Sequence, residues 1–498
     1  MHGVTRLLCV ISMAAAVSAT GCGKGPKASA APTTKDLLGA WSGTMTHEGE
    51  EQMLAFELEP AEEGKVSIRL TLPAMNLLQQ PVGAVEPAID GNEVTLGQFV
   101  LIYDGEAESL TGMMPAGMVP GYEIPVTLRR AEAVEAPTRP EPTAPLVEPV
   151  WTFDAGAPLW AGATFANGVV YAGDDEGRLH ALDAGTGAER WSFAAGGPIR
   201  TRATFAAGAV YFQADDGILY RLDAASGKEV WQSRVVETSI VRLPPTDPQS
   251  RYDSFGSDVT VADGRLFLGT HEGRLVAVDP ADGKPLWEFE ADGSVLAAPA
   301  VSSGRVFFGS FEGDVHALDA ATGEPLWKTD TRGAVLSTPA VAGDVLVIGN
   351  RTYDLLGLKA ETGEVAWKGY IWFSWVESSA TIESGVAYIG SSDAAAVFAF
   401  DASTGKRLWE TDVFGWAWGQ PAVTADRAFV QTAGLRGYAG DAHRGGVMAL
   451  ERDTGQAVWR YAIEPPEEGA WGFPGSPAVG AGHVFVTGID GRVLAFAQ

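Results

Sequence analysis

The chain has 498 residues, of which 46% are hydrophobic and 20% charged, and its formal net charge is −28. This acidity argues against nucleic acid or an anionic membrane surface as a partner, because both favour clusters of Lys and Arg. The 61 glycines and 29 prolines favour many short strands joined by tight turns, and the length allows more than one domain.

Residues 1–21 are expected to be a signal peptide. Arg6 gives a basic start, an apolar run follows from Leu7 to Val17, and the segment ends in small residues directly before Cys22. The apolar run is too short to span a membrane as a mature helix. Small residues before a cysteine resemble the bacterial lipobox, which implies that Cys22 is lipidated and becomes the mature N-terminus. Ordinary signal cleavage is the alternative.

Four regions follow the signal peptide. Residues 22–36 are small and polar, which predicts a flexible tether. Residues 37–131 alternate apolar and polar side chains between Gly, Pro and Asp breaks, so a small antiparallel β-domain is expected. Residues 132–149 are rich in proline and form a semi-rigid linker. Residues 150–498 contain a repeat.

The repeat is a version of L-D-A-x-T-G-x-x-x-W that occurs seven times. Its copies end at Trp191, Trp231, Trp287, Trp327, Trp367, Trp409 and Trp459, at spacings of 40, 56, 40, 40, 42 and 50 residues. A period near 40 with turn signals in each unit predicts a β-propeller of four-stranded blades. The T-G pair favours a hairpin with glycine in the left-handed region, and each tryptophan is expected to pack between neighbouring blades.

The number of blades follows from the two ends of the array. Three more strands are predicted after Trp459, whereas Trp151 lies in an isolated outer strand before the first repeat. If Trp151 completes the last blade, the fold is all-β. It is an eight-bladed propeller closed by N- and C-terminal strands and preceded by the small β-domain. Trp151 then joins the seven repeat tryptophans in a structural docking role.

Over residues 150–498 the repeat resembles the tryptophan-docking motif of the pyrroloquinoline quinone (PQQ) propeller family. The resemblance implies one of two functions. Quinoprotein dehydrogenases of that family hold PQQ and calcium at the centre of the ring. BamB-like outer-membrane lipoproteins keep the repeats without the cofactor and act in outer-membrane protein assembly.

The residues favour the cofactor-free class. The cysteine pair that supports PQQ in many alcohol-oxidising members is missing, because Cys9 leaves with the signal peptide and Cys22 would carry lipid. The pairs Asp174-Asp175 and Asp215-Asp216 each precede a glycine, which predicts hairpin turns rather than calcium ligands. We therefore expect no catalytic residue, no metal site and no cofactor. PQQ and calcium belong only to the dehydrogenase alternative.

Six tryptophans lie outside both the repeat and the small β-domain, in connections that lead to the inner strands of blades 1, 6, 7 and 8. They are Trp160, Trp372, Trp375, Trp416, Trp418 and Trp471. Phe373, Phe414, Phe473 and Arg200 lie in connections of the same kind. Blades 6, 7, 8 and 1 are consecutive in a closed ring, so these residues should gather on one sector of one face. Such an aromatic sector is typical of a binding surface, and the alternative is that bulky side chains fill wide connections.

Two insertions interrupt the repeat. Residues 236–255 and 431–446 are longer than their counterparts and carry Arg242, Arg251, Arg436 and Arg444, which we expect to be exposed.

The predicted function is a non-catalytic scaffold in the cell envelope. It would be a monomeric ring that binds another protein, held at the membrane by lipid on Cys22. Gly23 after that cysteine implies, by the lipoprotein rule, the outer membrane, with the ring facing the periplasm. A PQQ-dependent dehydrogenase and a propeller that binds a small ligand or carbohydrate remain as alternatives.

Overall fold

The computed structural model describes residues 31–47, 50–75, 77–97, 99–115, 123–135, 137, 143–247, 256–372, 374–436 and 445–498. The predicted signal peptide, Cys22, Arg251, Phe373 and Arg444 lie outside these residues. Within them, no helix is both long enough and apolar enough to cross a membrane. The chain forms two compact units, Met1–Glu141 and Pro142–Gln498.

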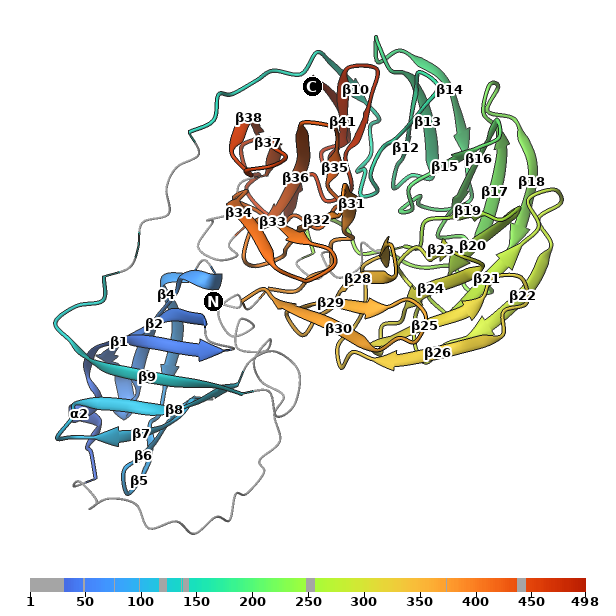
Figure 1. Ribbon diagram of the computed structural model, residues 1–498. Coiled ribbons are helices and arrows are strands. Elements are labelled where there is room, and N and C mark those ends of the chain that lie inside the picture. Colours follow the sequence, from blue (N-terminus) through green and yellow to red (C-terminus); the bar gives the residue numbers. More distant parts are fainter. Residues whose placement is uncertain are drawn as a thin grey trace. The chain divides into compact units, whose positions relative to one another are not determined.

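The first unit is one curled antiparallel sheet of nine strands in the order β4-β3-β2-β1-β9-β8-β7-β6-β5 (Figure 1). Its strands are β1 (Gly39–His47), β2 (Glu50–Pro60), β3 (Val66–Leu72), β4 (Leu77–Val85), β5 (Ala88–Asp90), β6 (Glu93–Leu96), β7 (Phe99–Asp104), β8 (Ser109–Pro115) and β9 (Glu123–Ala131). Three single-turn helices accompany them, namely α2 (Thr34–Leu37), η2 (Glu62–Gly64) and η3 (Pro73–Met75).

Trp41 lies at the centre of this unit. Its side chain is fully buried, and its Nε1 donates a hydrogen bond to the carbonyl oxygen of Leu37 at 2.7 Å. The guanidinium of Arg130 lies 4.1 Å from the centre of the indole ring and donates to the carbonyl oxygen of Leu38. This cation–π contact joins β1 to β9 next to the core. The predicted small antiparallel β-domain is confirmed.

The second unit is a ring of eight antiparallel sheets (Figure 1). Blade 1 contains β11 (Thr164–Ala166), β12 (Val169–Gly173), β13 (Arg178–Asp183) and β14 (Glu189–Ala194). Blade 2 contains β15 (Thr204–Ala206), β16 (Ala209–Gln213), β17 (Ile218–Asp223) and β18 (Glu229–Arg234). Blade 3 contains β19 (Thr260–Ala262), β20 (Arg265–Gly269), β21 (Arg274–Val278) and β22 (Pro285–Glu290). Blade 4 contains β23 (Ala300–Ser302), β24 (Arg305–Gly309), β25 (Asp314–Asp319) and β26 (Pro325–Asp330).

The remaining blades repeat this order from inner to outer strand. Blade 5 contains β27 (Ala340–Ala342), β28 (Val345–Gly349), β29 (Asp354–Lys359) and β30 (Val365–Tyr370). Blade 6 contains β31 (Thr381–Glu383), β32 (Val386–Gly390), β33 (Ala396–Asp401) and β34 (Arg407–Asp412). Blade 7 contains β35 (Ala422–Val423), β36 (Arg427–Leu435), β37 (Gly446–Glu451) and β38 (Ala457–Ala462), and β39 (Ala470–Gly472) pairs with β36.

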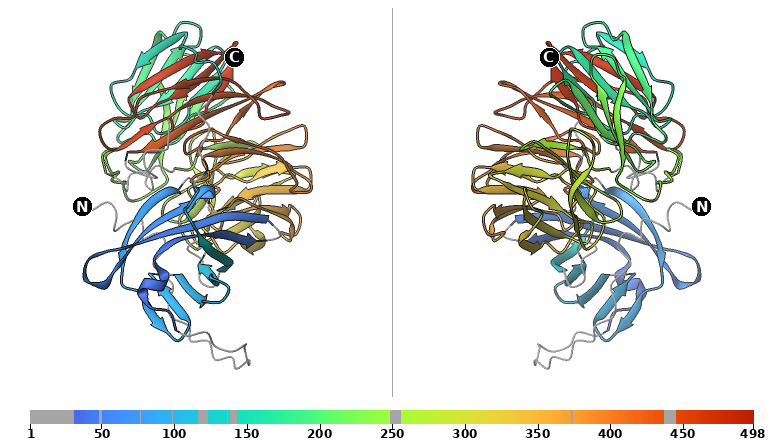
Figure 2. Two further views of the ribbon diagram at one scale, coloured as in Figure 1. Left: turned by 90° about the vertical axis from the view of Figure 1, so that its left-hand side faces the viewer. Right: turned by 90° about the vertical axis from the view of Figure 1, so that its right-hand side faces the viewer.

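Blade 8 joins the two ends of the ring. Its inner strands are β40 (Ala478–Gly480), β41 (His483–Thr487) and β42 (Arg492–Ala497), and its outer strand is β10 (Trp151–Asp154). The pairing places Trp151 opposite Ala495 and Asp154 opposite Arg492. Figure 2 shows the blades from the two sides. The prediction of eight blades closed by Trp151 is confirmed.

Each docking tryptophan except Trp459 contacts the glycine turn of the following blade. The Nε1 of Trp367 donates to the carbonyl oxygen of Ala402 at 3.1 Å, and a Cβ on Gly405 would lie 2.3 Å from the indole ring. The same bond to the next blade is formed by Trp151, Trp191, Trp231, Trp287, Trp327 and Trp409. Trp459 instead packs on Phe496 and Phe429, because the outer strand of blade 8 does not follow a glycine turn. The repeat therefore encodes the contact between blades.

Two buried histidines occupy the same strand position in blades 1 and 4. His180 lies between carboxylates, with Nδ1 2.7 Å from Glu189 Oε1 and Nε2 3.1 Å from Asp174 Oδ2. Burial lowers its pKa, but these two bonds outweigh burial, so the pKa of His180 is raised. His316 stacks on Phe308 at 4.9 Å, and burial lowers its pKa.

These opposite shifts predict opposite effects of pH on stability. The contribution of His316 is present above its unfolded pKa of about 6.5 and is lost as the pH falls. The contribution of protonated His180 is complete below that value and is lost as the pH rises through its raised folded pKa. The stability difference between wild type and His316→Phe should therefore shrink on acidification, and that for His180→Phe should shrink on alkalinisation. Denaturant unfolding between about pH 5 and about pH 8 tests this, and parallel profiles would contradict it.

Candidate functional site

One end of the propeller, called here the upper face, is formed by two kinds of segment. These are the hairpins between the second and third strands of each blade and the connections into the next inner strand. In several blades the same backbone hydrogen bond joins the hairpin to the connection that precedes it. The bond runs from Asp175 N to Pro158 O at 2.9 Å and from Asp215 N to Pro198 O at 2.9 Å. Arg351 N makes it to Ala334 O at 3.0 Å. Asp175, Asp215 and Arg351 therefore occupy equivalent positions.

Side chains at these positions form ion pairs with the connection that follows. Arg200 binds Asp175 through Nε and Nη2 at 2.8 and 2.7 Å. Arg242 binds Asp215 in the same way at 2.7 and 2.8 Å.

Between blades 5 and 6 the charges are exchanged, because the hairpin carries Arg351 and the connection carries Glu377, with Nε to Oε1 at 2.6 Å. Two-point arginine–carboxylate pairs are directional, so they hold neighbouring blades in register.

These pairs correct one expectation. The side chain of Arg242 is only 7% exposed, because it lies against Asp215 instead of pointing into solvent. Arg436 is exposed, as predicted. Asp174, Asp175, Asp215 and Asp216 lie in hairpins, as the glycines after them indicate. Their arginine partners were missed because the pairing depends on which connection meets which hairpin.

Part of the aromatic sector comes together where blades 7, 8 and 1 meet. Trp160 and Trp416 form a buried cluster with Leu435, Ala470 and Ile489, and Trp418 packs against it. The rings of Trp416 and Trp418 are stacked, with centres 4.7 Å apart and planes 12° apart. The guanidinium of Arg200 lies 4.9 Å from the centre of the Trp160 ring. Trp160, Trp416 and Trp418 are distant in sequence and meet because the ring closes.

The other members of the sector lie further round the face. Trp375 stacks under Arg351 at 4.5 Å, and Trp372 contacts the ring of Tyr370 at 5.2 Å. Phe473 is fully buried in the core between blades 7 and 8.

Five of the six tryptophans are buried, for example Trp160, whose side chain is 3% exposed, and Trp418 is partly exposed. This burial favours the alternative that the rings fill wide connections. Binding by these rings stays a prediction.

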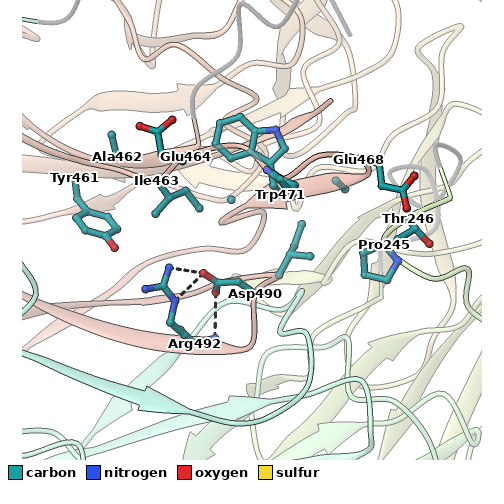
Figure 3. Close-up of a pocket in the computed structure, with 14 residues that line it drawn as sticks. Pro245, Thr246, Tyr461, Ala462, Ile463, Glu464, Glu468, Trp471, Asp490 and Arg492 are labelled. Atoms are coloured by element: carbon teal, nitrogen blue, oxygen red, sulfur yellow. Dashed lines mark hydrogen bonds and ion pairs between the residues drawn. The ribbon is translucent and has the colours of Figure 1, made fainter. Parts of the chain in front are cut away.

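A hollow of about 550 Å³ lies beside this cluster (Figure 3). Its walls include Tyr461, Ile463, Trp471 and Pro245, with Glu464 and Glu468 at its rim. Trp471 belongs to β39, which pairs with the end of β36. It is the member of the aromatic sector that lines the hollow.

The first insertion supplies one wall of the hollow. The carbonyl oxygen of Pro245 accepts a hydrogen bond from Ala470 N at 2.9 Å. Gly469 has φ +90°, and a Cβ there would lie 2.9 Å from the same oxygen, so this approach requires glycine. A segment that leaves blade 2 thus reaches the connection between blades 7 and 8.

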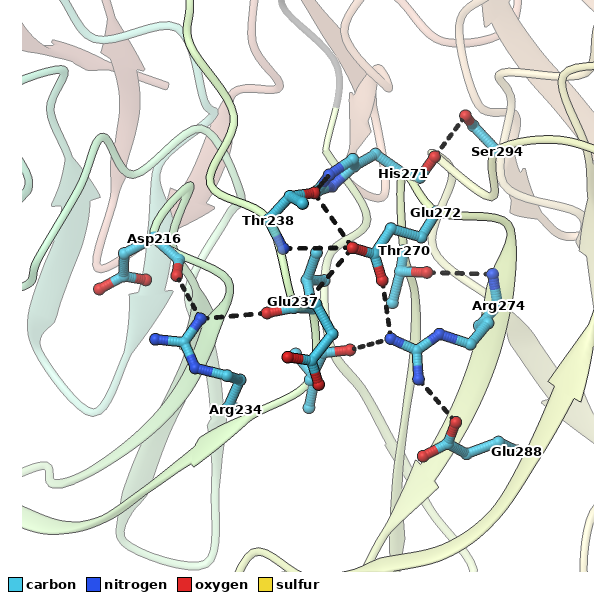
Figure 4. A network of polar contacts seen from close by, with 12 residues as sticks. Asp216, Arg234, Glu237, Thr238, Thr270, His271, Glu272, Arg274, Glu288 and Ser294 are labelled. Carbon is cyan, nitrogen blue, oxygen red and sulfur yellow. Dashed lines mark hydrogen bonds and ion pairs between the residues drawn. The ribbon is translucent and has the colours of Figure 1, made fainter.

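A polar network fixes the base of this insertion (Figure 4). Glu272 accepts hydrogen bonds from the amides of Glu237 and Thr238, both at 3.2 Å. Arg274 binds Glu272 at 2.9 Å and Glu288 at 2.7 Å, so the contacts extend to the outer strand of blade 3. The insertion is anchored at its base by these bonds and at Pro245 by Ala470.

The hollow carries excess negative charge. At its floor Asp490 binds Arg492, with Nε to Oδ2 at 2.7 Å, so these two charges balance. Glu464 and Glu468 are exposed and add two further negative charges. Aromatic walls beside carboxylates suit a segment that presents an apolar side chain together with a basic one.

The closed ring of eight blades joined by tryptophan docking defines a PQQ-like β-propeller. A family model described as "Outer membrane protein assembly factor BamB" matches residues 148–249, 238–369 and 371–495, and the chain belongs to this family. No curated protein sequence matches the chain.

Solved structures share the fold at low identity. The computationally designed Ika8 protein is 15% identical with a TM-score of 0.56, over 69% of this chain and 98% of that one. The quinohemoprotein alcohol dehydrogenase of Comamonas testosteroni is 14% identical with a TM-score of 0.53, over 70% and 76%. Sqt1 of Saccharomyces cerevisiae is 15% identical with a TM-score of 0.55, over 70% and 98%.

The charged and aromatic groups of the upper face are largely paired within the chain. The space between blades 7, 8 and 1 is filled by the cluster around Trp160 and Trp416. Arg200, Arg242 and Arg351 are each paired with a carboxylate of the chain itself. In the part of the chain that the structure describes, no three His, Cys, Asp or Glu side chains converge as a metal site. The absence of a bound cofactor stays a prediction.

Proposed function

We propose that the chain is a non-catalytic scaffold of the cell envelope that binds a partner protein and acts in outer-membrane protein assembly. Membership of the BamB family supports the class of function. In this proposal lipid on Cys22 holds the protein at the outer membrane, and the ring acts as a monomer in the periplasm without a bound cofactor.

The observation that carries the proposal is the hollow between blades 7 and 8. Half-buried Tyr461 and the largely buried Trp471 line the hollow, and Glu464 and Glu468 add negative charge at the rim. Large rings beside a polar rim are typical of the residues that dominate protein interfaces. A loop or helix of the partner with an apolar anchor and a basic neighbour would complement these groups.

Charge reversal at the rim tests this proposal. Glu464→Lys/Glu468→Lys should reduce co-purification of the envelope partner by about fivefold or more, because it replaces attraction by repulsion at the contact. Both side chains are exposed, so the fold is expected to persist.

The matched control is Glu361→Lys/Glu383→Lys, which changes the same charge at exposed sites on blades 5 and 6. Equal co-purification by the two double variants and wild type would refute a partner site at the hollow.

A further inference from the structure

The outer strand of each of blades 1 to 7 carries a β-bulge at the residue before the docking tryptophan. In blade 3, Val278 pairs with Pro285 and Ala277 with Trp287, so Leu286 is the extra residue. The equivalent extra residues are Arg190, Val230, Leu326, Ala366, Leu408 and Val458. A bulge leaves its extra residue outside the ladder, and here several of these residues are aliphatic.

On blade 7 the chain covers this edge itself. Residues 145–147, Pro-Leu-Val, run parallel to β38, with Arg460 N donating to Pro145 O at 2.9 Å and Val147 N donating to Arg460 O at 3.0 Å. Val147 and Val458 both pack against the core cluster between blades 7 and 8. We call residues 145–147 the strap. They lie in the predicted linker, where Leu146 forms an isolated parallel bridge with Arg460.

Blades 2, 3 and 4 present the same edge without a strap in the part of the chain that the structure describes. Their bulge residues Val230, Leu286 and Leu326 are 51%, 48% and 49% exposed. The residue that follows the docking tryptophan is Arg460 in blade 7 and Gln232, Glu288 or Lys328 in blades 2 to 4. Because these residues occupy the same position in the sheet, their backbone amides and carbonyls also face outward. Blade 1 has Arg190 and blade 5 has Ala366 at the bulge, so blades 2 to 4 form an arc of three consecutive edges with large aliphatic bulge residues. Leu408 of blade 6 is 48% exposed and is a single edge of the same kind.

We propose that this arc binds an extended segment of a partner protein as the strap binds blade 7. The segment adds a parallel strand at Gln232, Glu288 or Lys328 and places uncharged aliphatic residues beside the bulge. Main-chain hydrogen bonds give such strand addition its affinity, and side-chain contacts give it selectivity. This proposal takes from the proposed function only that the occupant is a protein. The arc and the hollow share no residue, so the two proposals can fail independently.

The test uses a fluorescent peptide with the sequence of residues 143–149, Thr-Ala-Pro-Leu-Val-Glu-Pro, and the full mature chain. Fluorescence anisotropy should show saturable binding. Val230→Lys/Leu286→Lys/Leu326→Lys should weaken it by about tenfold or more, since charge on an edge strand opposes pairing. The control Ala225→Lys/Ala281→Lys/Ala321→Lys places the same three charges at exposed turns of the same blades and should retain wild-type affinity.

A photoreactive leucine in the peptide locates the site. Crosslinks are expected within β18, β22 and β26. No saturable binding, equal binding by the two triple variants, or crosslinks confined to β38 or to the hollow would each overturn the proposal. The charge reversal at Glu464 and Glu468 should leave peptide binding unchanged, so failure at the hollow and failure at the arc can be told apart.

Discussion

Gly405→Ala is expected to lower the free energy of unfolding by about 3 kcal/mol or more, which is a large part of the stability of a typical domain. Gly405 has φ +72°, and its new Cβ would lie 2.3 Å from the ring of Trp367. The left-handed conformation alone costs a non-glycine residue about 1 to 2 kcal/mol. Displacement of the docked indole adds the cost of overpacking, about 1 to 3 kcal/mol.

Gly385→Ala is the matched control in the same blade. Gly385 has φ +79°, but an added Cβ would meet nothing within 4 Å. Its cost should therefore be the conformational part alone. Urea unfolding of both variants measures the difference, and equal destabilisation would show that contact with Trp367 does not determine the choice of glycine.

Arg200→Met is expected to cost about 3 kcal/mol, because it leaves Asp175 without its partner at the junction of blades 1 and 2. The Arg200 side chain is 1% exposed and Asp175 is 16% exposed, so solvent only partly replaces the lost contact. Arg200→Met/Asp175→Leu should recover most of the loss, since no unpaired charge remains.

Unfolding of wild type, both single variants and the double variant completes a double-mutant cycle. Additive effects of the two substitutions would contradict a strong ion pair between these blades.

The repeat made most of the ring predictable. Its period identifies the blades, and the isolated strand at Trp151 identifies the closure, because both depend on local pattern. The ion pairs at the upper face were not predictable in this way. Arg200, Arg242 and Glu377 meet partners in the preceding blade, and a correct pairing requires the alignment of hairpins with connections in space.

The site was predictable only in part. The surplus tryptophans could be placed on blades 6, 7, 8 and 1 from the sequence, but their burial depends on how the connections fold over one another. The hollow depends on the path of the first insertion, whose contact at Pro245 no local pattern indicates. Trp471 was singled out from the sequence, whereas Tyr461 was not, because it follows the docking Trp459 as an ordinary strand residue.

The proposed contact between the hollow of blades 7 and 8 and a partner protein in the envelope can be captured by crosslinking. Its most direct test places a photo-crosslinking amino acid at Glu464 and, as control, at Glu361, followed by irradiation of intact cells. One dominant protein adduct is expected from position 464, and it should be absent from position 361. Adducts of equal pattern at both positions, or an adduct from position 361 alone, would contradict it.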